Sequence, residues 1–450
     1  MESGAIPLPP LWTVAPFALY LLAIALVPLI APHFWEPNRN KLGVAAVASI
    51  PVVAYLLASA HGAHWLAQSL KEYVAFIALL GALYAISGGI HLKGSLAGTP
   101  LSNTVFLALG AVLASVIGTT GASMLLIRPI LRANRKRDSR VHIVVFFIFI
   151  VANGGGLLTP LGDPPLFLGF LRGVPFFWTL RLAGAWAMVN GLLLLIFNLL
   201  DQYALNNEER RRSGSQLEAV QEVKVPLVIE GGINFLWLMG VVATILAVGT
   251  WGDRLSPNED VHKLVHVTGM LLMTALSFAT TANAVRKSNH YTWHPMAEVA
   301  VIFIGIFVTM APALKVLEMR GGELGLTRPW QFFWATGTLS SFLDNAPTYL
   351  TFASLAVGAS NRLVPGQHLS AADLSGLISH PAGAMLLAAI SAGAVFMGAN
   401  TYIGNGPNFM VKAIAESQHV KMPSFFGYML WSLAVLVPIF VLVTLVFFRA

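Results

Sequence analysis

The chain has 450 residues, of which 56% are hydrophobic and only 10% are charged, and its mean hydropathy is +0.72. A water-soluble protein of this composition would expose large apolar patches, so a soluble enzyme is excluded and a polytopic membrane protein is expected. The absence of cysteine excludes disulfides and thiolate metal sites. The net charge of +7 arises from basic residues between apolar runs, which indicates membrane topology and not nucleic-acid binding.

Apolar runs separated by charged or turn-rich segments predict an all-α polytopic membrane protein. The first run, 11–32, follows ten residues without Lys or Arg, so we expect a retained helix and not a cleaved secretory signal. Simple spans follow near 42–60, 73–91, 176–200, 232–250, 261–282, 296–316 and 423–448. Two further spans, 141–171 and 381–415, are interrupted by Gly, Pro and Asn residues.

Two apolar stretches, 98–131 and 329–358, are too long for one span and have polar middles, at Gly118–Ser123 and Asp344–Thr348. Each is either a pair of spans or a re-entrant hairpin, whose polar tip must be buried in protein or line a wet cavity. Hairpins place the basic residues of 132–140 in the cytoplasm and both termini outside a cell (inner) membrane, as the positive-inside rule requires. We therefore predict two re-entrant hairpins.

The charged segment 201–225 predicts a cytoplasmic linker between two halves of comparable length. The N-terminal half, 1–200, holds the hairpin 98–131 and the broken helix 141–171. The C-terminal half, 226–450, holds the hairpin 329–358 and the broken helix 381–415. Because the two hairpins are expected to enter from opposite sides, the halves are predicted to be inverted repeats.

The two broken helices contain related sequences, at Ala152–Phe167 and Ala399–Phe409. Both give Ala-Asn, then Gly-Asp or Gly-Asn, then x-Pro-x-Phe, with five fewer residues between these landmarks in the second copy. Paired broken helices in inverted repeats are the general plan of secondary transporters, which hold the substrate near the breaks. Free carbonyls beside Asn, Thr and Asp suit a hard cation such as sodium, whereas free N–H ends favour an anion.

The run Ala-Asn-Gly-Gly-Gly-x-x-Thr-Pro-x-Gly-Asp at 152–163 resembles the signature of the NhaD-type sodium/proton antiporters. These belong to an ion-transporter superfamily with arsenite permeases, citrate transporters and sodium-coupled dicarboxylate carriers. The tip Asp344–Thr348 is similar to the Asp-Asn-x-Pro hairpin of that superfamily, and the likeness extends from about Gly98 to Phe448. Pro164-Pro165 and the run Gly404–Asn408 look more like the citrate-transporter branch, which leaves the substrate open.

The resemblance implies a homodimer that moves substrate by an elevator-like shift. It implies that the ion site is lined by Thr119, Thr120, Asn153, Thr159, Asp163, Asp344, Asn345 and Asn400, with Asn405 as the counterpart of Asp163 in the second copy. Acids inside a membrane are costly and usually functional. Sodium is accordingly expected on Asp163, Asp344, Asn153 and Asn400.

Three functions compete at this stage. The first is sodium/proton antiport at the paired acids, and the alternative is sodium- or proton-coupled transport of citrate or a similar carboxylate. The third is a membrane scaffold that transports nothing, against which the polar breaks argue. The chain has no nucleotide loop or nucleophile motif, so no enzyme activity is expected, and no cofactor other than the transported sodium. The expected partners are sodium, protons and the lipid bilayer, with a carboxylate anion as the substrate of the alternative function.

Overall fold

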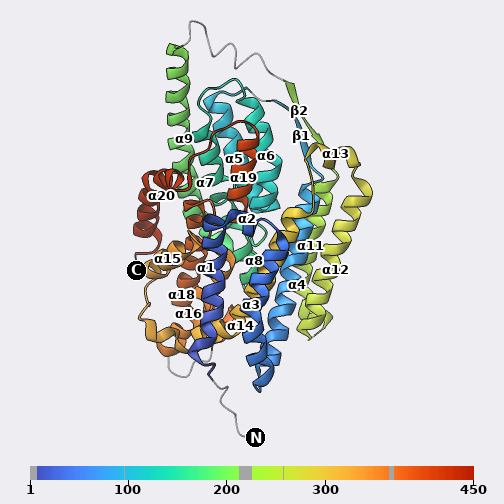
Figure 1. Cartoon of the computed structure of the whole chain (residues 1–450), viewed down its shortest axis with the longest axis vertical. Coiled ribbons are helices and arrows are strands. Elements are labelled where there is room, and N and C mark those ends of the chain that lie inside the picture. The colour runs from blue at the N-terminus through green and yellow to red at the C-terminus, as the bar shows by residue number, and fades with distance from the viewer. Residues whose placement is uncertain (1–7, 96, 212–224, 257, 364–368, 450) are drawn as a thin grey trace.

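The computed structural model describes residues 8–95, 97–211, 225–256, 258–363 and 369–449. Within these ranges, ten helices are long and apolar enough to cross a membrane, and strands are confined to one short pair. Figure 1 shows the helices running mostly along the long axis of the molecule. The predicted class, an all-α polytopic membrane protein, is confirmed.

The first part of the chain follows the expected order of spans, hairpin and broken helix. Its elements are α1 (Val14–Ile30), α2 (Pro32–Trp35), α3 (Asn38–Ala58), α4 (Gly62–Ser87), β1 (His91–Ser95), α5 (Pro100–Ile117), α6 (Thr119–Ala133), α7 (Val141–Ile150), η2 (Gly154–Leu158), α8 (Pro164–Leu171), η3 (Phe176–Leu182) and α9 (Ala183–Arg211). Helices α5 and α6 form the first hairpin, and α7, η2 and α8 form the first broken helix.

The second part repeats this order. Its elements are β2 (Val225–Glu230), α11 (Asn234–Leu255), α12 (Glu259–Thr280), α13 (Asn283–Ser288), α14 (His294–Arg320), η4 (Gly321–Leu324), α15 (Pro329–Ser340), α16 (Asn345–Leu363), α17 (Ser375–Ile378), α18 (Pro381–Met397), η5 (Gly398–Asn400), α19 (Gly406–Ser417) and α20 (Phe425–Phe447). Helices α15 and α16 form the second hairpin, and α18 and α19 are the arms of the second broken helix.

The two hairpins enter the molecule from opposite ends. Figure 1 shows α5 and α6 in the upper half of the view and α15 and α16 in the lower half. The first hairpin reverses at Gly118, whose φ of 81° is a conformation that residues with a Cβ rarely adopt. The chain therefore has the inverted arrangement that the repeated sequence predicts.

The broken helices form the centre of the molecule. Of the windows that could span a membrane, those at 141–158 and 381–400 are each 89% buried, against 28% for α20. Both windows are apolar on every side, as expected of helices surrounded by protein. The breaks are therefore shielded by the surrounding helices, which permits non-helical backbone at this depth.

Three features differ from the expected layout. Helix α4 begins at Gly62, before the predicted start at residue 73, and buries Glu72 against Arg172 at 2.8 Å. Helix α9 continues to Arg211 through the start of the predicted linker, because the buried ion pair of Asp201 removes the charge that suggested a solvated segment. The rest of that linker, 212–224, lies outside the described residues. Strands β1 and β2 pair antiparallel, which the helical pattern does not indicate.

Candidate functional site

The two breaks are built by the same hydrogen bonds. The Thr159 hydroxyl donates to the Ser115 carbonyl oxygen at 2.5 Å, and the Thr401 hydroxyl donates to the Ser341 carbonyl oxygen at 2.5 Å. Each threonine oxygen also accepts a bond from the backbone N–H two residues later, at 3.1 and 3.2 Å respectively. In both copies the break is thereby fastened to the end of the neighbouring hairpin helix.

These bonds correct the pairing that the sequence suggested between the copies. Thr159 corresponds to Thr401, so the segment 156–167 aligns with 398–409 without a gap, and Asp163 aligns with Asn405 as expected. Asn153 and Asn400 are consequently not equivalent. The Ala-Asn dipeptides of the two copies suggested a wrong alignment, because they are alike in sequence but make different contacts. The alignment of the two copies is fixed by the hydrogen bonds of Thr159 and Thr401 at the breaks.

The same bonds correct the expected pairing of residues between the two hairpin tips. Because Ser115 and Ser341 hold equivalent threonines, the residues four positions later correspond, and these are Thr119 and Asn345. The counterpart of Asp344 is therefore Gly118, and not a member of the Thr119–Thr120 pair. Only the second hairpin carries an acid at this position.

Asp163 lies where both hairpins and both broken helices meet. Its side chain is 1% exposed, and three side chains donate hydrogen bonds to it. The Thr119 hydroxyl and the Asn405 amide reach Oδ1 at 2.9 and 3.3 Å, and the Asn345 amide reaches Oδ2. Donors arranged in this way stabilise the ionised carboxylate. Thr119 and Asn345, which are equivalent in the two hairpins, therefore both donate to Asp163.

Asp163 and Asp344 open onto one cavity of about 100 Å³, which has room for roughly three water molecules. The breaks and hairpin tips form one wall, and α4 and α14 form the other with Leu79, Leu80, Leu83, Tyr84, Pro295, Met296, Val299 and Phe303. None of the described residues that line this cavity is Lys, Arg or His. Its acidic side chains are Asp163 and Asp344.

Asp344 accepts fewer hydrogen bonds than Asp163. Its Oδ1 accepts one hydrogen bond, from the backbone N–H of Ala346 at 3.1 Å. A carboxylate has about four lone-pair positions, so most of the acceptor capacity of Asp344 is unused by the described residues. This carboxylate can accept a proton or contribute oxygen ligands to a cation.

The structure brings some of the predicted site residues to the cavity and leaves others outside its lining. The residues that line it are Thr119, Thr120, Asp163, Asp344 and Asn405. The other four lie outside the lining, although Asn345 still bonds to Asp163. Thr159 fastens the first break, and Asn400 donates to the Ser341 hydroxyl at 2.9 Å. The expectation that Asn400 ligates sodium beside Asp163 is therefore not supported by its position.

Asn153 lies outside the cavity lining and bonds to residues of the second broken helix. Its amide donates to Asn408 Oδ1 at 2.7 Å, and its Oδ1 accepts a bond from Asn405 at 3.1 Å. Asn408 is not identified as a site residue from the sequence. Its side chain is fully buried and donates to the carbonyls of Gly398 and Thr401 at 2.8 and 2.9 Å. The signal that could have identified it is its place two residues after Gly406, within the repeated x-Pro-x-Phe pattern.

Four helices begin at the cavity: α6, α8, α16 and α19. A helix N-terminus carries a partial positive charge that favours anions, including the two carboxylates. Much of their donor capacity is already used, however. The Thr119 N–H bonds to the Gly162 carbonyl at 2.9 Å, and Pro164 and Pro407 supply no N–H at the starts of α8 and α19.

Residues 7–448 match the model of a family described as "putative citrate transport". The chain belongs to this family. The match supports the citrate-transporter side of the resemblance and gives no particular support to NhaD-type antiport. No individual curated protein matches the chain. This membership, together with the ten apolar helices found among the described residues, identifies the chain as a multi-pass membrane protein of a transporter family.

Proposed function

We propose that this chain is a secondary transporter that exchanges sodium ions for protons at the cavity between its two breaks. The observation that carries the proposal is the pair Asp163 and Asp344 on one cavity whose described lining has no basic side chain. Ionised acids are costly at this depth unless a cation compensates them. Carboxylate, hydroxyl and amide oxygens are suitable ligands for a hard cation.

The two carboxylates have different roles in this proposal. Asp163 receives three side-chain hydrogen bonds, which favour its ionised form and position it as a fixed sodium ligand. Asp344 accepts a single backbone bond and is the group that we expect to take up and release the proton. Since sodium and the proton neutralise the same pair of acids, binding of one opposes binding of the other.

A second candidate function is transport of a carboxylate together with a cation. It is supported by the family description and by the four helix N-termini at the cavity. In this mechanism the cation bound between Asp163 and Asp344 would attract the anion, which would otherwise be repelled by two acids. Citrate or a similar carboxylate is the substrate class that the family description suggests.

Reconstitution into liposomes separates the two candidates. The purified chain is sealed in vesicles with a pH-sensitive dye, and sodium chloride, potassium chloride or sodium citrate is added outside. Sodium chloride alone should move protons out of the vesicle if exchange is correct. A pH change that requires citrate together with sodium would support carboxylate transport. No response to any salt would contradict both candidates.

The acids are tested in the same assay. We expect Asp163→Asn to abolish sodium-driven proton movement, and Asp344→Asn to abolish it or to leave sodium movement without protons. Asp260→Asn is the matched control, because Asp260 is an exposed acid that bonds to Lys71 at 2.6 Å, away from the cavity. Near-normal exchange by both cavity variants would mean that the two acids only support the broken backbone.

A further inference from the structure

A second cavity lies apart from the cation site, where the start of α9, the start of α18 and the end of α20 meet. Its volume is about 500 Å³, within the roughly 300–1,000 Å³ that small-molecule sites occupy. It shares no described lining residue with the cavity of Asp163 and Asp344. The proposed exchange mechanism therefore makes no use of this space, which we call the α18 cavity.

The buried walls of the α18 cavity are apolar and include several small side chains. They are formed by Leu182, Ala185, Ala384, Ala388 and Phe448. Ala384 and Ala388 lie one turn apart on the same face of α18, and Ala185 lines the same space from α9. Alanine leaves room beside a helix that a larger side chain would fill, and an apolar wall favours an apolar occupant. The walls therefore suit a hydrocarbon group.

The rim of the α18 cavity carries one basic side chain, Arg181. This residue is exposed, and its guanidinium carbon lies 4.8 Å from the centre of the Trp178 ring. The other polar side chain of the described lining is Ser379, whose hydroxyl donates to the Gly376 carbonyl at 2.6 Å. None of the described lining residues is Asp or Glu, so no carboxylate in the cavity compensates the charge of Arg181.

The α18 cavity lies where three helices end. Helix α9 begins at Ala183, α18 begins at Pro381 and α20 ends at Phe447, and the last two of these residues line the cavity. The ends of membrane-spanning helices lie near the lipid headgroups, where Arg and Trp side chains are favoured. The pair Arg181 and Trp178 is therefore at a suitable depth to meet a headgroup.

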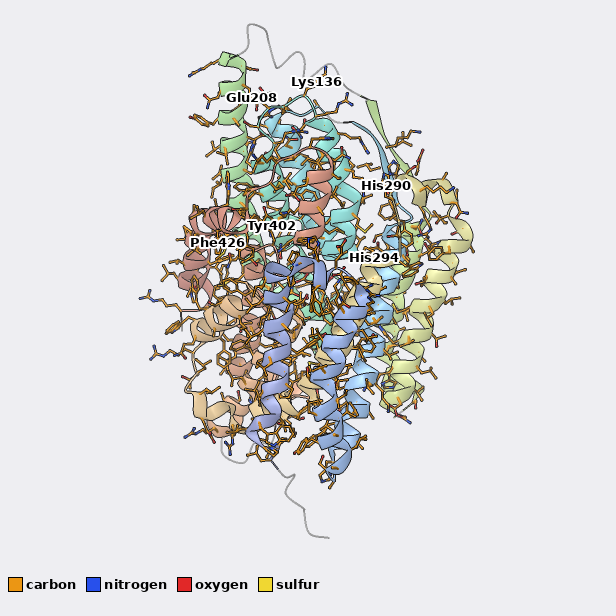
Figure 2. All side chains as sticks on the ribbon, in the orientation of Figure 1. Lys136, Glu208, His290, His294, Tyr402 and Phe426 are labelled. Carbon is orange, nitrogen blue, oxygen red and sulfur yellow. The ribbon has the colours of Figure 1, made fainter. Side chains whose placement is uncertain are left out.

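The surface around the α18 cavity is apolar. Large side chains are exposed on η3, α18 and the last turn of α20, at Phe177, Leu180, Met385, Leu445 and Val446. Figure 2 shows Phe426, near the other end of α20, at the left edge of the molecule, and this side chain is also exposed. Exposed apolar side chains on a membrane-spanning helix are expected to face lipid. The cavity therefore opens onto a surface that acyl chains can reach.

We propose that the α18 cavity binds an anionic phospholipid. The lipid phosphate accepts two parallel hydrogen bonds from the Arg181 guanidinium, and an acyl chain lies along the apolar walls between α18 and α20. Charge complementarity selects this occupant, because a lipid without net charge would leave the cation uncompensated, and a free anion would leave the walls without an apolar partner. The lipid thereby joins α18, an arm of the second broken helix, to α9 and α20.

The test measures the thermal stability of the purified full chain in detergent while lipid is titrated, since a ligand of the folded state raises its stability. Phosphatidylglycerol, phosphatidylcholine and sodium phosphate are the probes. Phosphatidylglycerol should act at a lower concentration than phosphatidylcholine, and sodium phosphate should have no effect. Arg181→Gln should raise the phosphatidylglycerol concentration needed for half of the response about tenfold, and it should leave the response to phosphatidylcholine unchanged. Ala388→Phe, which fills the apolar part of the cavity, should weaken the response to both lipids.

Two matched controls separate the cavity from general effects of charge and size. Arg39→Gln removes an exposed arginine of α3, and Ala187→Phe enlarges an exposed alanine of α9; neither residue lines the cavity. Both variants should respond to phosphatidylglycerol as the wild type does. Equal losses in Arg181→Gln and Arg39→Gln would overturn the proposal, since they would reflect net charge alone.

The remaining outcomes are also decisive. Equal responses of the wild type to both lipids, or an unchanged phosphatidylglycerol response in Arg181→Gln, would overturn recognition of an anionic headgroup. Sodium phosphate that acts as well as phosphatidylglycerol would replace the lipid by a free anion. Light scattering that shows a wild-type oligomer and an Ala388→Phe monomer would mean that a second copy of the chain covers the cavity, and would also overturn the proposal. If Ala388→Phe fails to fold, the exposed site Arg181→Gln decides alone. Because no arm measures transport, failure of the lipid site would leave the proposed sodium exchange untouched.

Discussion

Replacement of Arg137 by glutamine should destabilise the protein at the segment that joins the first hairpin to the first broken helix. The Arg137 side chain is fully buried between α6 and α7. Its Nη2 lies 2.9 Å from Asp201 Oδ1, its Nε lies 3.2 Å from Glu208 Oε2, and its Nη1 donates to the Gly98 carbonyl at 3.1 Å. One cation thus compensates two buried carboxylates of α9.

The size of the destabilisation depends on the hydrogen bonds that Asp201 and Glu208 retain when Arg137 is replaced. Breaking a buried ion pair on one side costs about 3–5 kcal/mol, because a charge is left uncompensated. Asp201 retains bonds to His142 and Asn103, both at 2.8 Å, and Glu208 retains the backbone N–H groups of residues 138 and 139. These donors should keep the loss of free energy of unfolding near the lower limit, about 3 kcal/mol.

The assay is unfolding of the purified chain in mixed micelles, followed by the fluorescence of its 11 tryptophans. Lys93→Gln is the control, because Lys93 is 67% exposed and lies 3.4 Å from Glu230, so the change should be below about 1 kcal/mol. The double variant Arg137→Gln, Asp201→Asn should recover part of the loss by removing one unpaired charge. A change for Arg137→Gln no larger than that for Lys93→Gln would refute the reasoning.

Three other predictions concern the breaks and the topology. Asn405→Asp should retain more sodium-driven exchange than Asp163→Asn in liposomes, because it keeps the Asp163 carboxylate and adds an acid at the equivalent position; equal loss would mean that exchange requires the amide that Asn405 donates to Asp163. Gly162→Ala should abolish transport, since a Cβ there would overlap the carbonyl of Gly156 in the same break, whereas Gly191→Ala, in α9 and outside the cavity lining, meets no atom within 4 Å and should behave as wild type. Ser139→Cys, in a chain without native cysteine, should react with an impermeant thiol reagent only from the cytoplasmic side; labelling from outside would exclude the expected orientation of the first hairpin.

The sequence alone determined the membrane class, the two hairpins and the two broken helices. These are local properties, because the length of an apolar run decides whether it can span a bilayer, and Gly and Pro decide where it must break. Asp163 and Asp344 were also found from sequence, since an acid within an apolar stretch is conspicuous at any register.

Only the tertiary structure decided which residues surround these acids. Thr119 and Asn345 differ in chemistry, yet equivalent backbone bonds at the breaks place both on Asp163. Asn400 has the expected residue type, yet it faces Ser341 and not the cavity. The direction of a side chain at a break depends on which neighbouring helix satisfies the freed backbone groups, and that choice is made between elements distant in sequence. The same reason explains the end of α9. Its charged residues predict a solvated linker from sequence, but Asp201 is buried in an ion pair with Arg137, a residue distant in sequence.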